Sequence, residues 1–222
     1  GSWQVRSIYE LGDKEESGAR LLKGSLSDFF GLPIDGFLDS QSSSGLEIIR
    51  TLKSNPLSLL IGSTRLRSDL TFFELMKLYF GLNSVRADKI EEFDLLALEV
   101  LEPSNLADGT KVYSANTRLD SFTSETLSDP KIKSEQLTVA VLNGTDYSGL
   151  AQKASRMISN LGGNVIISDN TDPVPNSFVT GQDSFTKTKL KEIFHSKYAK
   201  IETQTASRAQ IVIFLGEDLK PK

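Results

Sequence analysis

A chain of 222 residues with a net charge of −4 and 38% hydrophobic residues has the composition of an ordinary globular protein, with room for one large or two small domains. It contains no cysteine and a single histidine, His195, which excludes disulfides and thiolate metal sites and removes most zinc and Ser-His-Asp arrangements. The slight charge gives no sign of nucleic-acid binding, and no apolar run approaches the roughly 18 residues of a membrane helix.

The first 130 residues predict an α/β unit, because segments with apolar residues at helical spacing alternate with short apolar runs. Gly31 is a plausible C-cap for the first helix, and Ser68 or Asp69 can cap the third. Asp108-Gly109 is a hairpin-type turn. We expect helices over about 15–30, 45–54, 70–82 and 117–127, and strands over 34–38, 57–61, 90–100 and 111–113.

The helix expected over 70–82 is apolar on more than one side. Its aromatic residues are Phe72, Phe73, Tyr79 and Phe80. So much apolar surface indicates a helix that is buried in its domain, covered by a missing segment or docked on another subunit.

A domain boundary is predicted at Ser128-Asp129-Pro130-Lys131, because these are turn residues, and residues 131–136 are expected to form a polar linker. Residues 137–222 contain 10 basic and 8 acidic residues, whereas residues 1–136 contain 15 and 21. This difference supports two units of separate character.

The stretch from Leu137 to Asn170 is the most informative part of the chain. An apolar run to Leu142, rich in β-branched residues, predicts a buried strand. Asn143-Gly144 ends the run, and both residues tolerate the positive φ that a tight exit from a strand can require. Apolar residues then recur at helical spacing until Gly162-Gly163, where the helix should end before a second strand.

The remaining elements complete a recognisable order. We expect strands over 165–168, 177–180 and 211–215 and a helix over 184–195. The order strand, helix, strand, strand, helix, strand matches the split βαβ, ferredoxin-like arrangement, so this α+β domain should have an antiparallel sheet covered by two helices on one face.

Four phrases in this region carry a family resemblance. They are VAVLNGT (139–145), SGLA (148–151), LGG (161–163) and AQIVIFLG (209–216). Together and in this order they resemble the C-terminal domain of the LytR family of cell-envelope proteins, over about residues 136–217. The resemblance implies a bacterial protein at the extracellular face of the membrane or in the cell wall, but it supplies no reaction. Attachment to the membrane would come only from an anchor outside this chain.

The first unit is similar, less closely, to the LytR–CpsA–Psr catalytic family. The similarity lies in GSLSDFFGLPIDGF (24–37), in DLTFFEL (69–75) and in residues 90–95. Full members transfer a polymer from a lipid-linked pyrophosphate onto peptidoglycan, with arginines holding phosphates and carboxylates binding a divalent metal. The family's early strands, which carry Arg and Asp residues, should lie upstream of Trp3. The resemblance therefore implies a divergent unit, truncated at its N-terminus, over residues 1–130.

The family's arginine-rich stretch before the second domain is also missing, since Arg118 is the one arginine between residues 103 and 136. We therefore assign no catalytic residue. The candidate ligand-binding residues are all basic: Arg65, Arg67, Lys187, Lys189 and Lys191. The arginine pair could clamp a phosphate while Asp69 holds a metal, or it could stand in a solvated loop with Asp69 as a helix cap. The three lysines could grip an anionic wall polymer or form a solvated helix face.

Two further features have ordinary explanations. Asn143-Gly144-Thr145 could present backbone N–H groups to an anion at a helix N-terminus, but it lacks the lysine and glycines of a P-loop and also suits a tight strand–helix turn. His195 ends a helix, where the helix dipole favours a cation, and without a second His or Cys it predicts no metal site.

The sequence therefore favours a non-catalytic bacterial cell-envelope module without a cofactor. Its C-terminal domain would bind peptidoglycan, another wall-associated polymer or an envelope protein, and not nucleic acid. The alternative is part of a phosphotransferase that attaches lipid-pyrophosphate-linked wall polymers to peptidoglycan with the help of a divalent metal. A membrane helix followed by Arg- and Asp-rich strands upstream of Trp3 would favour the enzyme.

Overall fold

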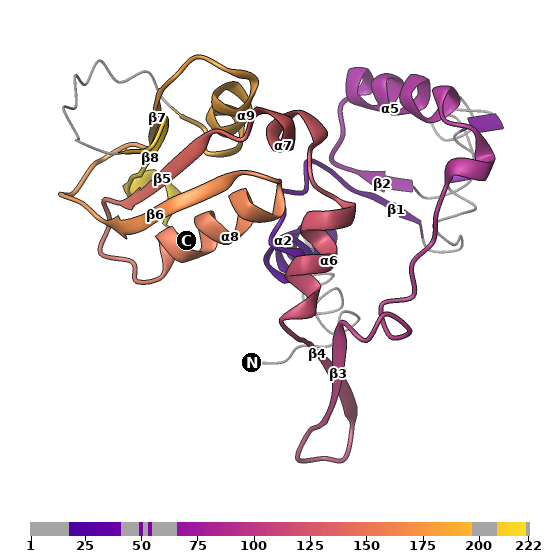
Figure 1. Cartoon of the computed structure of the whole chain (residues 1–222). Coiled ribbons are helices and arrows are strands. Elements are labelled where there is room, and N and C mark those ends of the chain that lie inside the picture. The colour runs from indigo at the N-terminus through magenta and orange to yellow at the C-terminus, as the bar shows by residue number, and fades with distance from the viewer. Residues whose placement is uncertain (1–17, 41–48, 51–52, 55–65, 197–207, 221–222) are drawn as a thin grey trace. The chain divides into compact units, whose positions relative to one another are not determined.

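The computed structural model describes residues 18–40, 49–50, 53–54, 66–196 and 208–220, and the chain forms two compact units (Figure 1). Unit 1 consists of Gly1–Leu26 and Ile34–Ser114, and unit 2 of Ser27–Pro33 and Ala115–Lys222. The boundary therefore lies upstream of the one predicted near residue 130, and a short early segment folds with the C-terminal unit. None of the described helices is long and apolar enough to cross a membrane.

Unit 1 is built from short elements. They are most of α2 (Gly18–Phe30), β1 (Leu38–Ser40), β2 (Leu66–Ser68), α5 (Phe72–Ser84), the 3-10 turn η1 (Ala87–Lys89), β3 (Leu101–Asn105) and β4 (Lys111–Ala115). β1 pairs antiparallel with β2. Asp69 ties this ribbon to α2, because its carboxylate lies 2.8 Å from Lys23 Nζ and accepts a hydrogen bond from the backbone N–H of Phe37.

Several predictions for unit 1 need correction. The strand expected over 90–100 is wrong, because Asp94 accepts hydrogen bonds from the backbone N–H groups of Leu96 and Ala97 and turns the chain before β3 begins. The strand expected over 34–38 begins only at Leu38. Of the helix expected over 45–54, residues 49–50 and 53–54 are described and helical. The strand expected over 57–61 lies outside the described residues.

The helix predicted over 70–82 is α5, and its cap differs from the prediction. Thr71 is the N-cap, and it forms a capping box in which Glu74 accepts the Thr71 backbone N–H at 2.7 Å. The hairpin turn at Asp108-Gly109 is confirmed, since Asp108 accepts the Thr110 N–H and Gly109 has a φ of 82°.

Unit 2 contains a four-stranded mixed sheet with helices around it. Its elements are α6 (Arg118–Thr126), α7 (Pro130–Glu135), β5 (Thr138–Asn143), α8 (Leu150–Asn160), β6 (Asn164–Asn170), β7 (Phe178–Gly181), α9 (Phe185–Ile193), β8 (Ile211–Leu215) and the 3-10 turn η2 (Glu217–Leu219). The predicted linker over 131–136 is thus mostly helix α7, which Asp129 caps and which buries Ile132.

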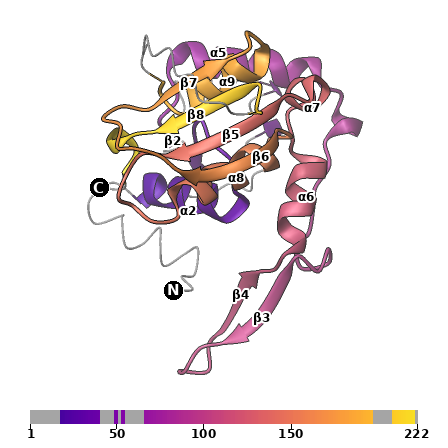
Figure 2. The same ribbon diagram turned by 60° about the vertical axis from the view of Figure 1, so that its left-hand side comes forward.

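The sheet does not have the predicted ferredoxin-like pairing. The order of elements is as expected, but the strands lie in the order β6-β5-β8-β7 (Figure 2), with β5 parallel to both neighbours and only β7 antiparallel. In a split βαβ unit another strand would separate β5 from β6. Here β5 and β8 are the strands buried along nearly their whole length, and such continuous apolar runs belong at the centre of a sheet covered on both faces. The alternating β6 and the short β7 take the edges.

Both long helices pack against one face of this sheet, as expected. Ala154 and Ile158 of α8 and Leu190 of α9 share a buried cluster with Val141 of β5 and Ile213 of β8. The opposite face has a second cluster. It comprises Ala140, Leu142, Phe178, Val212 and Phe214, with Ile167, Val174 and Ala209 packed against it.

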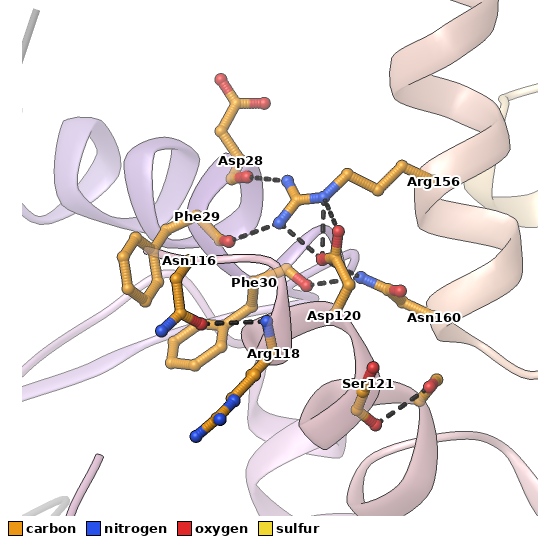
Figure 3. A network of polar contacts seen from close by, with 10 residues as sticks. Asp28, Phe29, Phe30, Asn116, Arg118, Asp120, Ser121, Arg156 and Asn160 are labelled. Carbon is orange, nitrogen blue, oxygen red and sulfur yellow. Dashed lines mark hydrogen bonds and ion pairs between the residues drawn. The ribbon is translucent and has the colours of Figure 1, made fainter. Parts of the chain in front are cut away.

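A polar network holds the last turn of α2 and helix α6 to α8 within unit 2 (Figure 3). The Arg156 guanidinium contacts the Asp120 carboxylate at 2.7 Å and donates to the main-chain carbonyls of Asp28 and Phe29. Asn160 donates to Asp120 and to the carbonyl of Phe30. These carbonyls lack helical partners because α2 ends there, so the network explains why residues 27–33 fold with the C-terminal unit.

Candidate functional site

The turn after β5 is organised by one buried side chain, Asn143, which is 4% exposed. Its carboxamide oxygen accepts hydrogen bonds from the backbone N–H and the hydroxyl of Thr145, at 3.1 and 2.8 Å. Its Nδ2 donates to the carbonyl of Tyr147 at 3.0 Å. The Asn-Gly-Thr triplet therefore forms a tight strand–helix turn whose polar groups bind one another.

Gly144 is required by close packing in this turn. Its N–H donates to the carbonyl of Leu215, and its carbonyl accepts from the N–H of Val174. A Cβ atom at this position would lie 2.5 Å from Val174 Cγ2 and 3.0 Å from the carbonyl oxygen of Asp172. The turn is thus fixed on one side by β8 and on the other by the loop that follows β6.

A polar cavity of about 360 Å³ opens beside this turn. It lies at the carboxyl ends of the parallel strands β5 and β6 and at the start of α8, which is the side of an α/β sheet where ligands commonly bind. Its lining residues are Asn143, Thr145, Asp146, Ser148, Gly149, Ala151, Gln152, Ser168, Asp169 and Asn170.

Two carboxylates set the electrostatics of the cavity. Asp146 forms an ion pair with Lys220, which also contacts Glu217. The hydrogen bond from Lys220 lowers the pKa of Asp146, and the bonds to Asp146 and Glu217 raise the pKa of Lys220. Asp169 is exposed at the end of β6, where its Oδ1 accepts the backbone N–H of Asn170 at 2.8 Å. No lysine or arginine is found among the described lining residues.

The three candidate lysines lie on α9, away from the cavity. Lys187 is mostly covered: its Nζ donates to the Gly181 carbonyl and pairs with Asp183, both at 2.7 Å, and the bond lowers the pKa of Asp183. Gly181 is in register with Ile211, the first residue of β8, so this end of α9 is near the amino ends of the parallel strands. Lys189 pairs with Glu192 at 3.5 Å, and Lys191 is exposed.

The other candidate residues are not brought into one site. Arg65 lies outside the described residues. For Arg67 the structure gives the position of the backbone, which lies in β2 opposite Asp39. Asp69 binds Lys23 and the N–H of Phe37 instead of capping α5. His195 follows α9 with a φ of 46°. Within the described parts of the chain, no three His, Asp or Glu residues form a group that could hold a metal ion.

The Asn-Gly-Thr turn was predicted from the sequence, but the cavity beside it was not. Ser168, Asp169 and Asn170 come from the far end of β6, and they approach the turn because β6 lies directly beside β5 and parallel to it. In the predicted split βαβ arrangement another strand would separate these two ends. The available signal was the polar Ser-Asp-Asn sequence directly after an apolar run.

Comparison with known families identifies the domain that carries the cavity. Residues 136–219 match the family described as LytR cell envelope-related transcriptional attenuator. This match covers the whole sheet of unit 2 and both of its long helices, so the C-terminal unit contains a LytR C-terminal domain, a domain associated with the cell envelope. No curated protein and no solved structure matches the chain significantly.

Proposed function

We propose that the LytR C-terminal domain of this chain is a non-catalytic binding module of a bacterial cell envelope and that it holds a wall glycan. It would act at the extracellular face of the membrane or within the wall, with any membrane anchor lying outside residues 1–222. The observation that carries the proposal is the polar cavity, because all of its lining residues belong to the part of the chain that matches the envelope family.

The side chains around the cavity suit binding better than catalysis. General acid–base chemistry needs a group whose pKa lies near the working pH, whereas Lys220 lowers the pKa of Asp146. Asn143 and Thr145 bind each other and the turn, so they support the cavity wall. Exposed carboxylate, amide and hydroxyl groups remain at Asp169, Gln152 and Ser148, and such groups bind a polar ligand by hydrogen bonds.

For unit 1 we propose a divergent LytR–CpsA–Psr-like fold. Two stretches that carry the sequence resemblance, 24–37 and 69–75, pack together in the structure. Asp69 accepts the Phe37 N–H at 2.8 Å, and a Cβ atom on Gly36 would lie 2.2 Å from Leu70 Cδ2. This packing supports reading the two stretches as parts of one fold.

The test is sedimentation of the whole chain with purified peptidoglycan, with and without its attached anionic polymer. The whole chain is needed because Arg156 and Asn160 bind residues 28–30, which a fragment that starts at residue 137 would lack. Retention by peptidoglycan stripped of anionic polymer supports the proposal. Absence of the chain from both pellets contradicts glycan binding.

An envelope protein is the second candidate ligand, and the aromatic residues of α5 favour it. Phe72, Phe73 and Phe80 are 55%, 77% and 61% exposed. Exposed aromatic side chains grouped on one helix are typical of protein-binding surfaces. Loss of binding to a partner envelope protein after Phe73→Ser, with glycan retention unchanged, would assign protein binding to α5.

A further inference from the structure

We infer that the cavity at the carboxyl ends of β5 and β6 binds an uncharged, hydroxyl-rich sugar unit and rejects the phosphate groups of an anionic wall polymer. This inference rests on the proposed glycan-binding function and names the ligand class of its site. Three properties of the cavity carry it: the sign of its charge, the polarity of its lining and the rigidity of its wall.

The charge of the cavity disfavours a phosphate. Arginine and lysine are the side chains that recognise phosphate, yet the described lining residues include two carboxylates and no basic side chain. The cavity does lie at the start of α8, whose first N–H groups favour an anion, but the two carboxylates line the same cavity and oppose that effect. Lys220, which contacts the lining residue Asp146, is already bound by Asp146 and Glu217. The exposed carboxylate of Asp169 would repel an anion but can accept hydrogen bonds from sugar hydroxyl groups.

The lining also disfavours an apolar ligand. Sites for lipids and drug-like molecules are lined mainly by apolar and aromatic side chains, whereas here Ala151 is the one apolar side chain among the described lining residues. The others offer carboxylate acceptors, hydroxyl groups at Ser148 and Ser168, and amide groups at Gln152 and Asn170. Neighbouring donors and acceptors of this kind match a sugar, because each hydroxyl group can both donate and accept.

The wall of the cavity is rigid, and its size suits a small ligand. Asn143 is buried and fixes the turn by bonds to Thr145 and Tyr147, and Gly144 is held between Leu215 and Val174. A wall that is ordered before binding lowers the entropy that binding must overcome. The volume of about 360 Å³ falls at the low end of the range of about 300 to 1,000 Å³ that is typical of small-molecule sites.

The experiment is NMR titration of the ¹⁵N-labelled whole chain with three ligands: a tetramer of N-acetylglucosamine, a tetramer of galactose and poly(glycerol phosphate). The two neutral sugars distinguish the peptidoglycan backbone from a neutral wall polysaccharide. We expect one of them to shift the amide signals of 143–152 and 168–170, and poly(glycerol phosphate) to leave these signals in place.

Two variants and a control test the site. Asp169→Ala should weaken binding about tenfold or more, the effect of a lost hydrogen bond to a charged group. Gln152→Ala should weaken binding about threefold to tenfold. Gln152 is an exposed helix position, where alanine favours the helix and should leave the fold intact. Asp172→Asn changes an exposed carboxylate that does not line the cavity and should bind like the wild type.

The possible results separate this inference from the function on which it rests. Retention of the wild-type chain by peptidoglycan, with equal retention of Asp169→Ala and Gln152→Ala, overturns the cavity assignment and leaves glycan binding intact. Shifts of the 143–152 and 168–170 signals with poly(glycerol phosphate) also overturn it, because the cavity would then accept phosphate groups. Unchanged cavity signals together with no retention of the wild type overturn both.

Discussion

Among the surface residues of unit 2, Arg156 should be the one whose substitution lowers stability most, and Arg156→Met tests this. The substitution keeps the aliphatic length of the side chain and removes the guanidinium. It would leave Asn160 as the described hydrogen-bond donor to Asp120 and would strip the carbonyls of Asp28 and Phe29 of their hydrogen bonds. Those carbonyls end α2, so no helical N–H replaces the lost donor.

The expected loss of stability is about 2 kcal/mol. A hydrogen bond to a charged group contributes about 1.5 to 3 kcal/mol when it is well buried. The side chains of Arg156 and Asp120 are 35% and 43% exposed, so water screens their interaction. Adding the full energy of each hydrogen bond would therefore overestimate the loss of stability. With a denaturant dependence of roughly 2 kcal/mol per molar urea, the unfolding midpoint of unit 2 should fall by about 1 M.

The assay is urea unfolding of the whole chain, followed by far-UV circular dichroism and by hydrogen exchange of the β5 and β8 amides, which report on unit 2. Lys153→Met is the matched control on the same helix. The Lys153–Asp28 pair is 58% and 68% exposed on its two sides, so its loss should change little. An Arg156→Met midpoint within about 0.3 M of the control would refute the argument that the network anchors residues 27–33.

Three further predictions concern pH, packing and capping. The Arg156 hydrogen bond lowers the pKa of Asp120 in the folded state. The stability that this ion pair contributes is therefore complete above the unfolded pKa of an aspartate, near 3.9, and is lost as the pH falls through the lower pKa of the folded state. Arg156→Met should thus make the free energy of unfolding depend less on pH in the acid range. Gly144→Ala should lower the stability of unit 2 by about 1–3 kcal/mol through overpacking, which urea unfolding measures. The control is Gly81→Ala, which should not destabilise the chain because no atom lies within 4 Å of the new Cβ. Glu135→Ala should lower the melting temperature, because this carboxylate accepts the first N–H groups of α9; an unchanged thermal midpoint would contradict the capping role.

The elements of unit 2 could be predicted from sequence because each leaves a local pattern. The β5 run, the apolar spacing of α8 and the β8 run lie where the sequence indicates. Strand pairing has no such local pattern. It could still have been inferred here, since β8 and β5 are the two most continuously apolar runs and a fully covered strand belongs at the centre of its sheet.

The polar network of Arg156 was beyond sequence reasoning for a different reason. Its partners are separated by as many as 130 residues, and a single Arg or Asp on a helix face gives no sign of such a contact. The cap of α5 was readable, by contrast. Thr71-Phe72-Phe73-Glu74 has the spacing of a capping box, and the earlier Ser68 and Asp69 were mistaken for the cap because they too are common N-cap residues.

Two of the phrases that carry the family resemblance, VAVLNGT and LGG, lie at opposite ends of α8 and perform different tasks. At the end of α8, Gly162 has a φ of 96°, and a Cβ atom there would lie 3.1 Å from Lys133 Cβ of α7. The carbonyl of Leu161 accepts the N–H of Asp129, the cap of α7. At the start, the Asn-Gly-Thr turn forms a wall of the cavity. Within unit 2, the contact with α7 and the proposed glycan site therefore lie at opposite ends of α8.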